Sequence, residues 1–120
     1  MHLEILYFPG CPNQAPAIAC LREALQQEGV PAVWTEVVVE DEEMAYRVGF
    51  LGSPTIRVDG QDVELSARSS REYGLGCRTY CDEGMRTGLP PLDWIRSAVR
   101  EAKSRQVLKS EELALPILRH

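Results

Sequence analysis

The residue best placed for chemistry is Cys11, which lies where a short apolar segment gives way to a helical pattern. A thiol at the N-terminus of a helix faces the positive end of the helix dipole, which stabilises the thiolate and lowers the pKa. Pro12 and Pro16 fit the first turn, where backbone N–H groups have no intrahelical partner to lose. We interpret Cys11 as a nucleophile or soft-metal ligand, with a buried structural cysteine as the alternative.

Three further cysteines follow Cys11, and their positions differ in what they predict. Cys20 falls inside the predicted first helix, roughly 13 Å from Cys11 at 1.5 Å per residue, which is too far for a disulfide. We interpret Cys20 as a small core residue. Cys77 and Cys81 lie in residues 66–89, a segment without periodicity that is long enough to carry function or to be disordered.

Composition narrows the class of protein. The chain has 120 residues and 44% hydrophobic content, which fits one globular domain, and no apolar stretch approaches the ~20 residues that span a bilayer. The N-terminus lacks a basic secretory leader, so we expect a cytoplasmic protein with reduced thiols that act in catalysis or bind metal. A net charge of -5 argues against nucleic-acid binding, and the basic cluster of residues 96–105 is interpreted as the solvated face of one helix.

Local patterns predict the elements that position Cys11. Residues 3–8 form an apolar, branched strand that Pro9-Gly10 ends, and residues 12–28 have helical spacing. Residues 32–39 are rich in valine and predict a second strand, parallel to the first through a right-handed crossover. Residues 40–48 begin with acidic side chains and end before Gly49, which predicts a short capped helix.

The second half of the pattern begins at Pro54. Residues 55–58 and 61–65 flank an Asp-Gly pair, which predicts a two-residue hairpin. The register predicts that one side of this hairpin carries Ile56, Val58, Val63 and Leu65. A last helix is expected after Pro90-Pro91, and the apolar residues beyond 105 form a tail that could pack back or mediate a homodimer.

The order of these elements, together with the segments Phe8-Pro9-Gly10-Cys11-Pro12-Asn13 and Gly52-Ser53-Pro54-Thr55-Ile56, resembles the thioredoxin-like superfamily. The resemblance covers residues 1–105, with 66–89 as a cysteine-bearing loop and 106–120 as a C-terminal tail. It implies an α/β fold of order β-α-β-α-β-β-α with a mixed four-stranded sheet and a C-terminal extension.

The resemblance also implies roles for residues around Cys11. In that family the proline before the third strand is cis and lies against the active cysteine, which corresponds to Pro54, and Ser53 would offer backbone groups to a partner. Pro12, Asn13 and Gln14 complete the predicted substrate-binding set. Gln14 replaces the second cysteine of the redox members, so Cys11 would form a mixed disulfide with a small thiol or be resolved by Cys77 or Cys81.

A narrower resemblance concerns the segments Gly76-Cys77-Arg78-Thr79-Tyr80 and Gly88-Leu89-Pro90-Pro91-Leu92-Asp93-Trp94-Ile95. They look like a bacterial thioredoxin-fold subgroup related to alkylmercury lyase, in which two thiolates hold mercury and an aspartate handles the proton. Gln14 stands at the aspartate's position and cannot deliver a proton at neutral pH. This resemblance therefore implies mercury binding by Cys11 and Cys77, without the lyase's own route to carbon–mercury cleavage.

Three functions follow as alternatives from the sequence. In the first, Cys11 exchanges with a small thiol or a protein disulfide, and Cys77 or Cys81 resolves the adduct. In the second, Cys11 and Cys77 bind a soft metal ion or an organomercurial. The third is a thioredoxin-fold module that binds a partner without chemistry. None of the three requires an organic cofactor.

Overall fold

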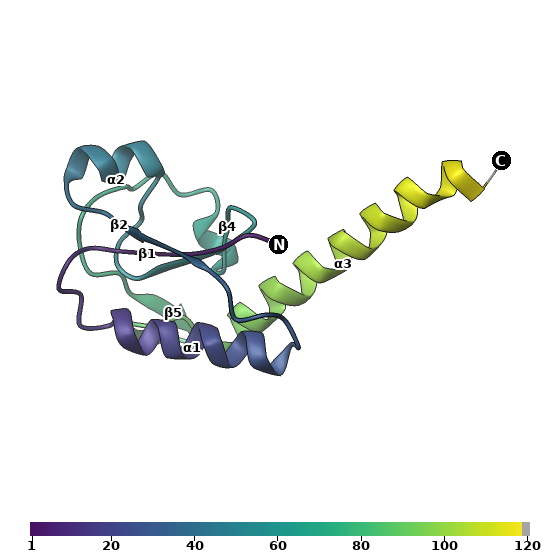
Figure 1. The fold of residues 1–120 in the computed structure, drawn as a ribbon. Coiled ribbons are helices and arrows are strands. Elements are labelled where there is room, and N and C mark those ends of the chain that lie inside the picture. Colours follow the sequence, from purple (N-terminus) through teal and green to yellow (C-terminus); the bar gives the residue numbers. More distant parts are fainter. Residues whose placement is uncertain (119–120) are drawn as a thin grey trace.

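A computed structural model describes the backbone of residues 1–118 and the side chains of residues 1–106. The chain is a mixed α/β protein in which three helices flank a four-stranded sheet (Figure 1). The elements run in the order β1 Leu3–Tyr7, α1 Gln14–Gln27, β2 Thr35–Val38, α2 Glu42–Val48, β3 Thr55–Val58, β4 Gln61–Asp62, a 3-10 helix Leu65–Ala67, β5 Tyr80–Asp82, β6 Met85–Thr87 and α3 Leu92–Leu118.

The sheet has the strand order β2-β1-β3-β4. β1 pairs in parallel with β2, with Leu6 opposite Val37, and antiparallel with β3, with Ile5 opposite Ile56. β3 and β4 form the hairpin predicted from Asp59-Gly60, and both turn residues have positive φ, as a two-residue hairpin turn requires. The predicted mixed four-stranded sheet and parallel first crossover are confirmed.

Alternation along β1 builds a core on each face of the sheet. Leu3 and Ile5 pack with apolar residues of α1 and α3, whereas Leu6 packs with Ala45 of α2 and with Phe50. Figure 1 shows α1 and the start of α3 on one side of the sheet and α2 on the other. The two periodicities in the sequence, two residues for strands and about 3.6 for helices, produce this layering.

The short helix α2 forms as its caps predict. The Asp41 carboxylate accepts a hydrogen bond from the Met44 N–H at 2.8 Å, and Gly49 ends the helix in the left-handed conformation with φ 69°. The predicted elements are longer than the observed ones at several ends: α1 begins at Gln14 instead of residue 12, β2 covers Thr35–Val38 instead of 32–39, and α2 begins at Glu42.

Two sequence predictions in the second half are wrong. Leu65 does not share the buried side of the hairpin: β4 ends at Asp62, the chain turns into the 3-10 helix, and Leu65 is 71% exposed. Residues 66–89 are not a loop without regular structure, because β5 and β6 form a hairpin there with Cys81 opposite Arg86. The Glu83-Gly84 turn has positive φ at both residues, but a Glu in that position gives no strong turn signal in the sequence.

Helix α3 begins after the predicted Pro90-Pro91 pair and continues without a break to Leu118. The boundary expected at residue 105, between domain and tail, is therefore not a boundary in the backbone. The expected packing or dimerisation through the apolar side chains of 106–120 concerns residues beyond 106 and lies outside the described side chains. No helix in residues 1–118 is both long and apolar enough to cross a bilayer.

The sequence pattern predicted that the basic residues at the start of α3 form a solvated face. In the structure, three of them contact Glu28. Arg96 and Arg100 donate to the Glu28 carboxylate at 2.8 and 3.0 Å, and Lys103 donates to the Glu28 carbonyl at 2.7 Å. The hydrogen bonds from Arg100 and Arg96 lower the pKa of Glu28. These contacts attach α3 to the C-terminal end of α1, where a helix carries negative partial charge.

Candidate functional site

The loop that carries Cys11 joins β1 to α1. The Cys11 N–H donates to the Phe8 carbonyl and the Gln14 N–H donates to the Cys11 carbonyl, each at 3.3 Å, so the loop is closed by its own backbone. Asn13 caps α1 without a side-chain hydrogen bond, and the first turn contains no acidic residue. The helix end beside Cys11 thus has neither a carboxylate nor a capping side chain to offset its positive partial charge.

Cys11 is largely enclosed, with 7% of its surface exposed. The Ser53–Pro54 peptide bond that precedes β3 is cis, as the resemblance implies, and both of its residues are buried. The Phe8 N–H donates to the Ser53 hydroxyl at 3.3 Å, which ties the start of the Cys11 loop to this turn. The hydrogen bond between Phe8 and Ser53 therefore connects the two segments that carry the resemblance, residues 8–13 and 52–56.

Cys77 is paired with Ser53 through the backbone. The Ser53 N–H donates to the Gly76 carbonyl at 2.8 Å and the Arg78 N–H donates to the Ser53 carbonyl at 3.0 Å, which makes an isolated parallel bridge between Ser53 and Cys77. Bridged residues lie on neighbouring strands, about 4.8 Å apart, with their side chains on the same face. Cys77 is exposed, so its thiol is accessible beside the turn that contacts the Cys11 loop.

Cys81 occupies a different place from Cys77. Burial alternates along this segment, with Arg78 and Tyr80 buried and Cys77 and Cys81 exposed, which indicates an extended chain in which four residues span about 13 Å. A disulfide or a shared metal ion between Cys77 and Cys81 is incompatible with that separation. All four thiols are free, and Cys20 is half-buried against the core with its sulfur 3.9 Å from the Pro90 carbonyl oxygen.

The other predicted substrate-binding residues lie at the start of α1. Pro12 is exposed, whereas Asn13 and Gln14 are half-buried. The Asn13 side chain packs directly against Gly88, where any added Cβ would collide with it. The segment that follows β6 therefore meets the cysteine motif at this point.

Sequence reasoning missed a buried ionic cluster behind the Ser53 turn. Arg78 donates to both oxygens of Asp62, at 2.7 and 2.9 Å, and to Glu64 at 3.1 Å, and the side chains of Arg78 and Asp62 are each only 5% exposed. Its guanidinium also donates to the Thr55 hydroxyl at 3.0 Å and lies 4.3 Å from the centre of the Tyr80 ring. Despite its burial, the ion pairs raise the pKa of Arg78, so the guanidinium stays charged.

Tyr80 links this cluster to the proline turn, because its hydroxyl donates to the Pro54 carbonyl at 2.6 Å. Burial raises the pKa of the Tyr80 phenol above its ordinary value, although the nearby Arg78 charge partly opposes the shift. The Tyr80 ring also meets the indole of Trp94 edge-on, with ring centres 6.3 Å apart, and so contacts α3.

The raised pKa of Tyr80 predicts a loss of stability at alkaline pH. The folded protein keeps the phenol proton where the unfolded chain, with a pKa of about 10, has released it. The contribution of the Tyr80 phenol to the free energy of unfolding is complete below the pKa of the unfolded chain. It is lost as the pH rises through the pKa of the phenol in the folded protein. We expect the free energy of unfolding, measured by urea titration, to fall more steeply above pH ~10 in the wild type than in Tyr80→Phe. The exposed Tyr46→Phe variant should retain the wild-type slope, and an unchanged slope in Tyr80→Phe would contradict the assignment.

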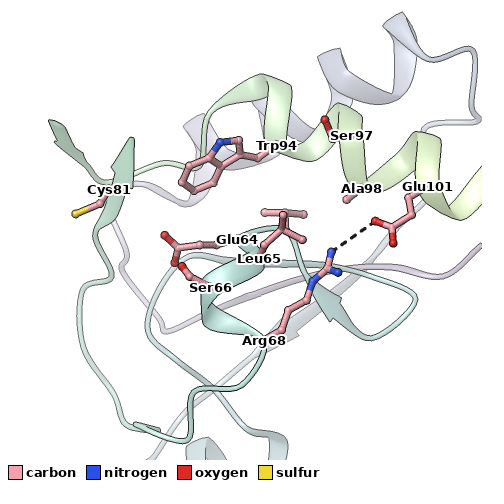
Figure 2. A pocket seen from close by; sticks show the side chains of 10 residues that line it. Glu64, Leu65, Ser66, Arg68, Cys81, Trp94, Ser97, Ala98 and Glu101 are labelled. Carbon is pink, nitrogen blue, oxygen red and sulfur yellow. Dashed lines mark ion pairs between the residues drawn. The ribbon is translucent and has the colours of Figure 1, made fainter. Parts of the chain in front are cut away.

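A cavity of about 390 Å³ lies between the 3-10 helix and α3. Figure 2 shows Trp94 and Leu65 on either side of it, the Arg68–Glu101 ion pair at one end, and the Cys81 sulfur pointing away from the indole. Cys81 thus contributes to the wall of the cavity without directing its thiol into it. Among the described residues, no group of three or more His, Cys, Asp and Glu side chains could hold a metal ion.

Comparison with known proteins yields no match to a family model, a curated protein or a solved structure.

Proposed function

We propose that this chain is a thiol–disulfide exchange protein of thioredoxin-like architecture, in which Cys11 attacks and Cys77 resolves. The proposal depends above all on the bridge between Ser53 and Cys77, because it holds a second, accessible thiol beside the turn that contacts the Cys11 loop. Gln14 excludes a partner thiol within the motif that starts at Cys11, so the second thiol has to come from elsewhere in the fold.

The architecture supports the proposal. A parallel β1-α1-β2 unit, an antiparallel β3-β4 hairpin and a closing helix follow the order of the thioredoxin-like resemblance. Cys11 lies just before the start of α1, whose first turn contains no acidic residue. Both features fit a cysteine that acts as a nucleophile.

The exchange proceeds in two balanced steps. The Cys11 thiolate attacks one sulfur of a disulfide R–S–S–R′, forms the Cys11–S–S–R mixed disulfide and releases R′S⁻. The Cys77 thiolate then attacks the Cys11 sulfur, forms a Cys11–Cys77 disulfide and releases RS⁻. The substrate disulfide is reduced by two electrons and the two protein thiols are oxidised, and an external thiol reverses the change.

Binding of a soft metal ion or an organomercurial is the second candidate, favoured by the thiol of Cys77, which pairs with Ser53, and by the contact of Ser53 with the Cys11 loop. Any such site would have two protein ligands from this region, and Gln14 supplies no proton for carbon–mercury cleavage. Titration with a phenylmercury salt separates plain binding from carbon–mercury cleavage, because binding consumes thiols without release of benzene.

Disulfide mapping tests the redox proposal. After stoichiometric oxidation of the full chain with a small disulfide, we expect peptide mass spectrometry to find Cys11 joined to Cys77, while Cys20 and Cys81 remain alkylatable. A dominant Cys11–Cys81 bridge would transfer the resolving role to Cys81. Four thiols that stay reduced after this treatment would refute the function.

A further inference from the structure

The backbone of Ser53 has no free hydrogen-bonding group. Its N–H donates to Gly76 and its carbonyl accepts from Arg78, and only 1% of the residue is exposed. We call residues 76–80 the strap, because this segment lies along the turn that precedes β3. The strap therefore occupies the edge that an incoming strand would need at Ser53.

The strap is held down by buried contacts along its length. Arg78 is fixed by its paired hydrogen bonds to Asp62 and by the Thr55 hydroxyl, and Tyr80 donates to the Pro54 carbonyl. At Gly52 the two segments approach so closely that a Cβ would lie 2.9 Å from the Arg78 Cβ. Lifting the strap would leave the Asp62 carboxylate buried without its partner, which is a strongly unfavourable state.

These contacts restrict what can reach Cys11. One general way in which an extended polypeptide binds to a sheet protein is to add a strand to a free edge, where main-chain hydrogen bonds supply the affinity. The strap uses those bonds itself, and Cys11 is only 7% exposed. A small disulfide needs no backbone edge and only enough room to align its sulfur atoms with the attacking thiolate.

We infer that the strap makes Cys11 selective for small-molecule disulfides over extended polypeptide disulfides. This inference rests on the proposed exchange function, and it assigns specificity to residues 76–80. Gly52 and Arg78 are positioning residues in this scheme, since they set the place of the strap and do not contact the reacting sulfurs.

The test compares two reagents that have the same leaving group. One is the 2-thiopyridyl disulfide of 2-mercaptoethanol, and the other is the 2-thiopyridyl disulfide of a single-cysteine peptide long enough to form a strand. The protein is the full chain with Cys20→Ser, Cys77→Ser and Cys81→Ser, because the exposed Cys77 could capture the peptide itself. Released thiopyridone gives the rate at Cys11, and both rates are divided by those measured with free cysteine.

We expect the normalised rate to favour the small reagent by about 30-fold. This is the factor for two ordinary hydrogen bonds, because the peptide reagent has to break the two bonds between Ser53 and the strap and the small reagent does not. Gly52→Ala in the same background should narrow this ratio, since the added Cβ pushes against Arg78, provided its circular dichroism matches the parent. Equal normalised rates in the parent would overturn the selectivity, whatever Gly52→Ala does. If Cys11 reacts with neither reagent, the exchange function itself fails, so the two failures are distinct.

Discussion

Cys11→Ser is expected to lose catalysed reduction of 2-hydroxyethyl disulfide completely, leaving only the background reaction of the reductant. A serine hydroxyl is not ionised at neutral pH and cannot form a mixed disulfide, so the first step has no nucleophile. The measurement is the initial rate with dithiothreitol as the reductant, followed by high-performance chromatography. Cys20→Ser is the matched control, because Cys20 packs against the core and away from the proposed exchange, and it should keep the wild-type rate.

In a single turnover with 2-hydroxyethyl disulfide and without dithiothreitol, Cys77→Ser should stop the exchange at a different stage. The first attack by Cys11 remains possible, but no neighbouring thiolate can displace the adduct, so intact mass spectrometry should show a stable mixed disulfide on Cys11. Cys81→Ser should turn over normally, since that thiol lies four residues along an extended segment. A stalled adduct in Cys81→Ser, with normal turnover in Cys77→Ser, would reverse the assignment of the resolving residue.

The second large effect concerns stability. Arg78→Met should lower the free energy of unfolding by about 3–5 kcal/mol, the usual effect of removing one partner of a buried ion pair. The variant leaves Asp62 buried without its two guanidinium hydrogen bonds and also removes the ring contact with Tyr80. Urea-induced unfolding followed by circular dichroism measures the change.

Two further variants separate burial from charge. Arg71→Met alters an exposed arginine a few residues away and should change stability by less than about 0.5 kcal/mol. The double variant Arg78→Met with Asp62→Leu removes both buried charges and should recover much of the loss, because an apolar pair of similar volume replaces an unpaired ion. Equal destabilisation in the single and double variants would show that packing, and not the unpaired carboxylate, dominates.

Much of the fold was predictable because its elements depend on local chemistry. The branched run at 3–8, the Asp41 and Gly49 caps of α2 and the Asp59-Gly60 turn each specify a conformation within a few residues. The cysteine at the start of α1 was identified in the same way, whereas the role of the proline before β3 was implied by the thioredoxin-like resemblance. Local sequence therefore predicted the elements and the two motifs, although not how the motifs meet.

Contacts between distant residues decided the remainder. Nothing near Arg78 in the sequence indicates that Asp62 pairs with it, and nothing near Cys77 indicates that it pairs with Ser53. Leu65 was misassigned for the same reason, because the chain leaves the hairpin after Asp62 and turns into the 3-10 helix.

The sequence by itself determined the helices, strands β1 to β4 and the cysteine at a helix start, since propensity, capping and turn chemistry act over a few residues. Only the tertiary structure decided which second thiol lies beside that cysteine's loop and what covers the Ser53 edge. A buried ion pair and a bridge between residues 24 positions apart form only when the core brings separate segments together, and no local pattern encodes that partnership.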